Sequence, residues 1–128
     1  MKKHILFIDE DTNDLKIFLD AIKKIPGEFK CTYATASTQA IEMLKYIVPD
    51  FIFIDYNLPK LNGLQFLAII RNEERLRNVR SFLYSNRITD EVNKMAMVLG
   101  ATGCIEKTDA VNMLAIELKS ALTTGMRA

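Results

Sequence analysis

The sequence has no excess of either charge, no long hydrophobic run and only two cysteines. Its 17 basic and 16 acidic residues give a formal net charge of +1, which provides no broad field for holding nucleic acid. No apolar stretch approaches the roughly 18 residues of a membrane span, and the basic N-terminus leads into no signal-peptide core. Cys31 and Cys104 lie far apart without metal-ligand spacing, so we expect reduced thiols rather than a disulfide or a zinc site. These absences predict a cytoplasmic protein that binds neither nucleic acid nor a membrane directly.

The length and composition fit one ordinary domain. The 128 residues, of which 49% are hydrophobic and 26% charged, suffice for a single buried core but leave no room for a second module. We therefore expect one domain over residues 1–128, with no output domain.

Strand-like and helix-like patterns alternate along the chain. The predicted strands are apolar or rich in β-branched and aromatic residues, and the predicted helices carry apolar residues at helical spacing, the second with Ser37 as a candidate cap. The strands are expected at 5–8, 29–34, 51–54, 81–85 and 102–106, and the helices at 12–24, 37–47, 64–70, 89–99 and 111–122. Five such (βα) repeats imply an α/β fold with a parallel five-stranded sheet, right-handed crossovers and helices on both faces, a flavodoxin-like three-layer sandwich.

Polar residues follow four of the predicted strands. Asp9 and Glu10 follow the first strand, Asp55 the third, Ser85 ends the fourth, and Lys107 follows the fifth. In open parallel sheets, ligands bind outside the carboxyl ends of the strands. If the first and third strands are neighbours, their carboxylates converge, and a cation must relieve the repulsion between them. A set of oxygen ligands with room for water and phosphate favours Mg²⁺.

The same edge offers groups that suit phosphoryl chemistry. The Lys107 ammonium and the Ser85 hydroxyl can bind phosphoryl oxygens, and Asp55 facing them can act as a nucleophile toward phosphorus. Each residue alone also has a simpler explanation, because acids often begin helices and a strand-end serine or lysine is ordinarily exposed. Their joint position at one edge favours a site. We expect an exposed Lys107, whose replacement leaves thermal stability nearly intact.

Four blocks of sequence resemble the response-regulator receiver domain over essentially the whole chain. Residues 5–11 resemble the opening strand of that family with its acidic pair, and residues 55–63 its phosphoacceptor and loop. Residues 83–85 resemble the strand that carries the switch hydroxyl, and residues 99–107 the segment that delivers an essential lysine. By this resemblance, we expect the strand order 2-1-3-4-5.

The resemblance implies phosphoryl transfer and a metal site. Asp55 would accept a phosphoryl group from a sensor histidine kinase or a histidine phosphotransfer protein, with Ser85 and Lys107 binding its oxygens. The protein would then signal through a downstream protein partner or pass the phosphoryl group on, as a signalling receiver and not an enzyme. The ligands of Mg²⁺, or of Mn²⁺, would be Asp9, Glu10, Asp55 and the backbone carbonyl of Asn57.

Two positions depart from the family pattern. Cys104 stands where the family usually has Tyr or Phe, and Thr108 stands where it usually has Pro. These departures bear on how the phosphorylated state is displayed, because the aromatic ring normally moves inward with the switch hydroxyl. Tyr84 does not replace that ring, because it is adjacent to Ser85 and should point to the opposite face of its strand.

Two other functions are compatible with parts of the pattern. A phosphatase or phosphotransferase of the haloacid dehalogenase type also forms an aspartyl phosphate, but such enzymes usually carry a second Asp two residues after the nucleophile, where this chain has Asn57. A flavodoxin-like nucleotide or flavin binder would need a Gly-, Ser- or Thr-rich loop after the first strand, and residues 9–13 are strongly acidic instead.

Overall fold

Five hydrophobic segments pair into one parallel sheet in a computed structural model, which describes residues 2–124. The strands are β1 (Lys3–Ile8), β2 (Phe29–Ala34), β3 (Phe51–Asp55), β4 (Arg80–Ser85) and β5 (Gly103–Glu106). Their order is β2-β1-β3-β4-β5, and every neighbouring pair is parallel. The predicted fold class and strand order are both confirmed.

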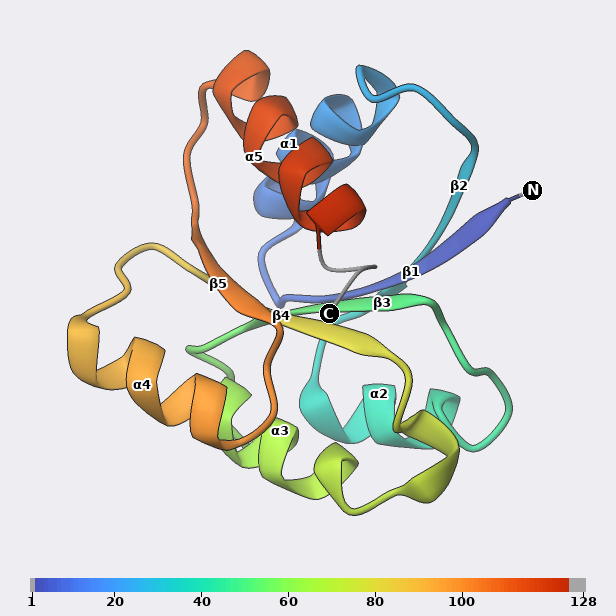
Figure 1. Ribbon diagram of the computed structural model, residues 1–128, viewed down its shortest axis with the longest axis vertical. Helices are drawn as coiled ribbons and strands as arrows, with labels where there is room; N and C mark the ends of the chain where they lie inside the picture. The colour runs from blue at the N-terminus through green and yellow to red at the C-terminus, as the bar shows by residue number, and fades with distance from the viewer. Residues whose placement is uncertain (1, 125–128) are drawn as a thin grey trace.

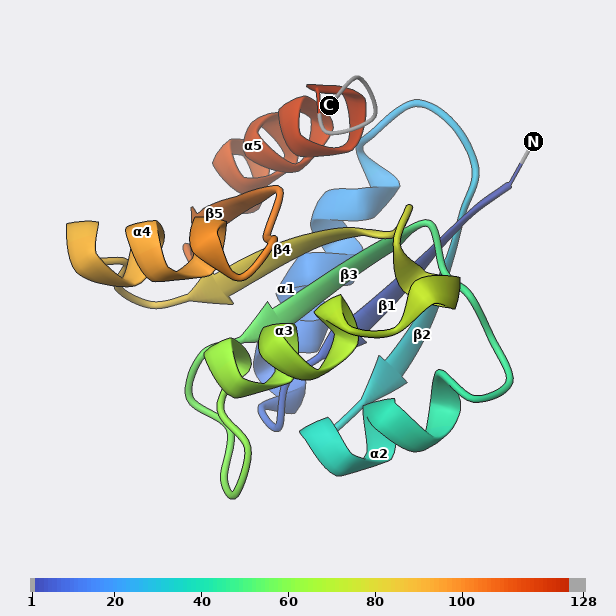
Figure 2. The ribbon, with the colours of Figure 1, turned by 60° about the horizontal axis from the view of Figure 1, so that its bottom comes forward.

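The helices cover both faces of the sheet, as the alternating pattern predicted. They are α1 (Thr12–Lys23), α2 (Ser37–Met43), α3 (Gly63–Arg71), α4 (Asp90–Val98) and α5 (Val111–Thr124), and a short 3-10 helix spans Glu74–Leu76. Helices α1 and α5 lie together on one face, while α2, α3 and α4 lie on the other (Figure 1). Seen from another direction, the parallel strands run toward the same edge of the sheet (Figure 2).

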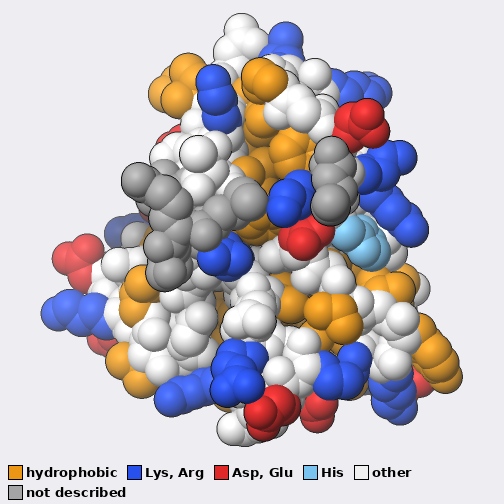
Figure 3. Space-filling model, turned by 45° about the vertical axis from the view of Figure 1, so that its right-hand side comes forward, with side chains coloured by type: hydrophobic (Ala, Val, Ile, Leu, Met, Phe, Trp, Pro, Cys, Tyr) orange, Lys and Arg blue, Asp and Glu red, His pale blue; other side chains and the backbone are white. Residues whose placement is uncertain are grey.

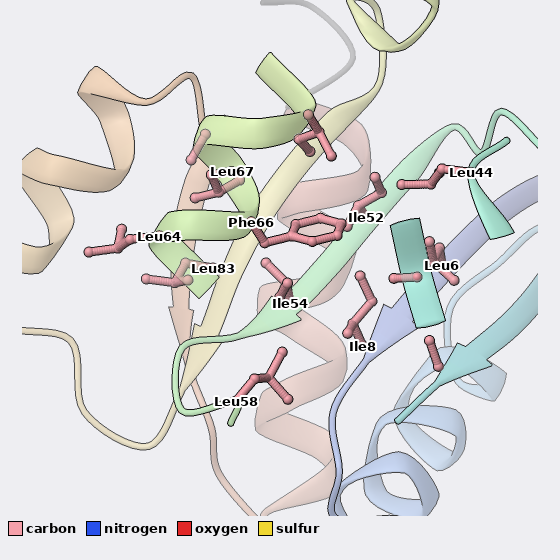
Figure 4. Packing of buried hydrophobic residues seen from close by; sticks show 14 of the residues in the cluster. Leu6, Ile8, Leu44, Ile52, Ile54, Leu58, Leu64, Phe66, Leu67 and Leu83 are labelled. Atoms are coloured by element: carbon pink, nitrogen blue, oxygen red, sulfur yellow. The ribbon is translucent and has the colours of Figure 1, made fainter. Parts of the chain in front are cut away.

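The sheet face toward α2, α3 and α4 is aliphatic. Because side chains alternate along a strand, every second residue of the central strands points to this face. The ring of Phe66 on α3 points toward Ile52 of β3, close to Ile54 (Figure 4). These side chains are fully buried, and burying each stabilises the fold by about 1.5–3 kcal/mol.

The opposite face, toward α1 and α5, is aromatic. Phe18 of α1 packs against Phe7 with ring centroids 4.3 Å apart and against Phe53 at 5.1 Å. Tyr84 lies edge-on to Phe7 and Phe18, at 5.7 and 5.9 Å. Tyr84 is therefore a core residue on the face opposite to the predicted switch hydroxyl, in agreement with the alternation of side chains along β4.

The second helix differs from its prediction at both ends. Ser37 is its first residue rather than its cap, and the Ser37 hydroxyl instead donates a hydrogen bond to the carbonyl of Leu61 at 2.7 Å. The helix ends at Met43 rather than at 47. The Leu44 carbonyl accepts a hydrogen bond from Arg75 Nη2 at 2.6 Å, and Pro49 lies shortly beyond. The two hydrogen bonds join the ends of this helix to segments distant in the sequence.

The surface carries charges of both signs. On the face in Figure 3, Lys and Arg side chains are interspersed with Asp and Glu rather than gathered into one field. Among residues 2–124, no helix is long and apolar enough to span a membrane.

Candidate functional site

Two carboxylates lie side by side at the carboxyl ends of β1 and β3. The register pairs Ile8 with Ile54, so the residues that follow, Asp9 and Asp55, are also neighbours. Asp9 is fully buried and Asp55 is 6% exposed. This is the point where the strand order reverses, the usual ligand position in such sheets.

Local hydrogen bonds orient both carboxylates. Asp9 Oδ1 accepts a hydrogen bond from the backbone N–H of Asp11 at 3.0 Å, and Asp55 Oδ1 accepts one from the backbone N–H of Asn57 at 3.3 Å. Each side chain is thereby tied to the loop that follows its own strand. The second oxygen of each carboxylate, Oδ2, lies near the side chain of Lys107, which directly follows β5.

Lys107 brings a positive charge between the carboxylates. Its backbone N–H donates to the carbonyl of Ser85 at 2.8 Å, which extends the pairing of β4 with β5 by one residue. Its Nζ lies 2.8 Å from Asp9 Oδ2 and 3.3 Å from Asp55 Oδ2. A third carboxylate, Asp14 on α1, places its Oδ2 at 2.8 Å.

The expectation that Lys107 is exposed was wrong. Its side chain is only 6% exposed, because it extends inward toward the ends of β1 and β3 rather than into solvent. The ammonium also lies 5.6 Å from the centroid of the Tyr84 ring. Lys107 is therefore part of the packed structure, and its contacts with these acids could not be predicted from local sequence patterns.

Burial and pairing have opposite effects on the titration of these groups. Burial by itself would lower the pKa of Lys107, but the carboxylates of Asp14, Asp9 and Asp55 outweigh it and hold that pKa above its ordinary value. Burial raises the pKa of Asp9, and Lys107 offsets only part of that effect. Lys107 therefore stays cationic at neutral pH, while Asp9 ionises less readily in the folded protein than in the unfolded chain.

Ser85, Glu10 and Asn57 lie at the same edge in different environments. Ser85 ends β4 and is 1% exposed. Glu10 and Asn57 are exposed, and the Glu10 side chain forms no ion pair or hydrogen bond within the part of the chain that the structure describes. Over residues 2–124, no three His, Cys, Asp or Glu side chains are arranged as a metal site. Of the predicted site residues, Asp9 and Asp55 are the two whose carboxylates contact the Lys107 ammonium.

Gly63 packs closely against the strand that ends at Asp55, a feature that the sequence analysis missed. A Cβ atom at position 63 would lie 2.8 Å from the Asp55 carbonyl oxygen and 2.7 Å from Leu83 Cδ1. The Gly63 backbone N–H donates to the carbonyl of Tyr56 at 3.0 Å, so the loop after Asp55 folds back on itself. The only sequence signal was a glycine directly after Asn62, the residue that caps α3.

Asp14 is the other contributor that sequence reasoning missed. It lies in the first turn of α1, where an acidic residue is ordinary because it interacts favourably with the helix dipole. Nothing in the spacing from Asp14 to Lys107, 93 positions along the chain, indicates that the two meet.

Position 104, where an aromatic residue was expected by resemblance, is partly exposed. Cys104 pairs in register with Leu83 and contacts the aliphatic cluster beneath the sheet. It also lines a hollow of about 750 Å³ between β5 and α5, together with Ile105 and Ile116. Burial raises the pKa of the Cys104 thiol, so the residue stays neutral at physiological pH.

Comparisons with known proteins show the family and the fold. The family model described as the response regulator receiver domain matches residues 5–119. Protein Rrf1 of Nitratidesulfovibrio vulgaris is 31% identical over 117 residues, which are 91% of this chain and 80% of Rrf1. Sensor histidine kinase CheAY of Helicobacter pylori is 28% identical over 105 residues, which cover 80% of this chain but only 13% of the kinase. The Mn²⁺-bound form of response regulator Rcp1 superposes with a TM-score of 0.81 at 16% identity, over 98% of this chain and 96% of Rcp1.

Proposed function

The chain belongs to the response regulator receiver domain family of two-component signalling, and we propose that it is a stand-alone receiver that accepts a phosphoryl group on Asp55. A receiver domain is a signalling module rather than a catalytic enzyme. The observation that carries the proposal is the position of Asp55 at the end of the central strand, with Asp9 beside it and Lys107 Nζ at 3.3 Å. The match to Rrf1, which covers 80% of that protein, supports a receiver without an output domain.

The proposed reaction is phosphoryl transfer from a phosphohistidine. A carboxylate oxygen of Asp55 attacks phosphorus, the bond from phosphorus to the imidazole nitrogen breaks, and the electron pair of that bond remains on the nitrogen. Lys107, already cationic and directed at Asp55, binds one of the phosphoryl oxygens. The hydroxyl of Ser85, at the end of the neighbouring strand, donates a hydrogen bond to another.

The donor set also fits a hard divalent cation. Asp9 Oδ2 is buried without a hydrogen-bond partner in the described residues, its contact with Lys107 being one of charge. Oxygens of Asp9 and Asp55, with Glu10 and the backbone carbonyl of Asn57 at the same edge, are ligands that Mg²⁺ or Mn²⁺ prefers. A bound cation would offset the charge of the carboxylates and of the phosphoryl group. The Mn²⁺-bound form of Rcp1 supports this part of the proposal.

The proposed partners follow from the family. The donor is a sensor histidine kinase or a histidine phosphotransfer protein, and the similarity to part of CheAY supports a link to such kinases. The phosphorylated protein then signals to a downstream protein target or passes the phosphoryl group on. The proposal retains a cytoplasmic protein with no direct nucleic acid or membrane partner.

Phosphorylation by a small donor tests the acceptor. With Mg²⁺ and acetyl phosphate, the wild type should gain the mass of one phosphoryl group and Asp55→Asn none. Asp50→Asn is the matched control, because Asp50 directly precedes β3 at the opposite edge of the sheet. Labelling of Asp55→Asn at the wild-type rate would refute the assignment. Repeated turnover of phosphate esters by the wild type would instead favour the haloacid dehalogenase type of enzyme.

A further inference from the structure

We propose that Asp14 competes with the phosphoryl group for Lys107 and thereby lowers the affinity of the site for that group. The inference rests on the proposed acceptor role of Asp55. Asp14 belongs to the first turn of α1 and not to the strand ends that carry the rest of the site. Its effect on the phosphoryl group would act through Lys107.

The contact between Asp14 and Lys107 is the best-formed interaction of the ammonium. Lys107 Nζ donates a hydrogen bond to Asp14 Oδ2 at 2.8 Å. Asp9 Oδ2 is equally close but lacks hydrogen-bond geometry, and Asp55 Oδ2 is more distant at 3.3 Å. In this arrangement the Lys107 ammonium donates its hydrogen bond to Asp14 and not to the acceptor Asp55.

A phosphoryl group on Asp55 would change this balance. It brings about −1.5 to −2 charge and three acceptor oxygens, whereas a lysine ammonium has three N–H donors in total. The phosphoryl oxygens would therefore compete for Lys107 with the three carboxylates that lie within 3.3 Å of Nζ. Asp14 is the residue to be released, because its side chain is 23% exposed and can be solvated, whereas that of Asp9 is 1% exposed.

Asp14 is not needed to keep Lys107 at the site. The backbone N–H of Lys107 donates a hydrogen bond to the Ser85 carbonyl. Its ammonium also contacts Asp9 and lies over the ring of Tyr84. Removing the charge of Asp14 should therefore leave Lys107 near Asp55 and free more of its charge for the phosphoryl group. If Asp14 only held Lys107 in place, removing its charge would weaken the binding of the phosphoryl group.

Binding of beryllofluoride, a mimic of the phosphoryl group, tests the inference in excess Mg²⁺. Asp14→Asn should bind the mimic about three- to tenfold more tightly than the wild type. Asp14→Glu, which restores a carboxylate, should return the affinity toward the wild-type value. The affinity for Mg²⁺ alone should not rise in Asp14→Asn, since a negative charge near the cation is lost. A variant whose whole site has become less ordered would instead bind both Mg²⁺ and beryllofluoride more weakly.

Asp11→Asn is the matched control for charge. Asp11 caps the same helix through its side chain, and asparagine can cap equally well while it removes one negative charge near the site. Equal or weaker mimic binding by Asp14→Asn, or the same gain in Asp11→Asn, would overturn the role of Asp14. A wild type that binds no beryllofluoride, or an Asp55→Asn variant that binds it equally well, would instead refute the acceptor role of Asp55 and the inference with it.

Discussion

The carboxylate of Glu106 accepts a hydrogen bond from the backbone N–H of Ile88 at 2.9 Å. Ile88 belongs to the loop that follows Ser85, and Glu106 directly precedes Lys107. At the end of this loop, Thr89 caps α4 by accepting a hydrogen bond from the backbone N–H of Val92 at 3.1 Å. The two segments that carry the proposed phosphoryl ligands are therefore joined to each other and to the start of α4.

Phosphorylation should move this connected region although Cys104 replaces the usual aromatic ring. Attraction of Ser85 and Lys107 toward the phosphoryl group acts directly on both loops, and α4 should respond as a shift in population. With Mg²⁺ and beryllofluoride, we expect backbone NMR signals to change mainly over residues 85–90 and around 107. In Glu106→Ala the changes around 107 should persist while those over residues 86–90 diminish. If the NMR signals of the wild type change only for the residues that bind the phosphoryl group, the site is uncoupled from the surface of the protein.

Asp9→Asn should stabilise the metal-free protein at neutral pH. Burial raises the pKa of Asp9, so the folded protein holds this proton more tightly than the unfolded chain does. Stability is consequently lost as the pH rises through that pKa, a loss that asparagine avoids. The advantage of the variant, measured by urea unfolding, should disappear when the pH falls toward the ordinary aspartate pKa. The variant should also bind Mg²⁺ at least about tenfold more weakly, and unchanged metal affinity would argue against Asp9 as a ligand.

Lys107→Ala should destabilise the metal-free protein substantially. It leaves the side chains of Asp9 and Asp55, 1% and 8% exposed, without their cation. The cost of an uncompensated buried charge is about 3 kcal/mol in the free energy of unfolding, and Mg²⁺ should restore part of it. Urea unfolding with and without Mg²⁺ measures both effects. Lys94→Ala, at an exposed position on α4, is the control, and an equal effect in the two variants would mean that Lys107 contributes nothing special to folding.

Gly63→Ala should both destabilise the fold and displace the acceptor. Its methyl group would meet the Asp55 carbonyl oxygen at 2.8 Å and Leu83 at 2.7 Å, so the strand end must shift. Overpacking of this kind costs about 1–3 kcal/mol, and labelling by acetyl phosphate should slow. Gly103→Ala provides a comparison, because its added Cβ would only reach ordinary contact with Phe82 at 3.6 Å. Thermal unfolding and labelling rates that match those of Gly103→Ala would contradict this account.

The alternation of apolar segments and the placement of polar strand ends were accessible from the sequence. Burial of a parallel strand requires a continuous apolar run, and an amphipathic helix requires apolar residues at helical spacing, so both patterns are local. The segment that became β2, 29–34, was predicted without error, and Asp9, Asp55, Ser85 and Lys107 all lie at the predicted edge. The strand order itself rested on resemblance to a known family, because periodicity does not specify which strands are neighbours.

Only the tertiary structure decided the contacts between distant segments. The burial of Lys107 among Asp9, Asp14 and Asp55 depends on how α1 and the end of β5 approach each other over 93 positions of sequence. Arg75 binds the Leu44 carbonyl just beyond the end of α2, and Gly63 lies close to Asp55 and Leu83. Such contacts are set by the packing of whole elements, to which every buried side chain contributes, so no local pattern contains them.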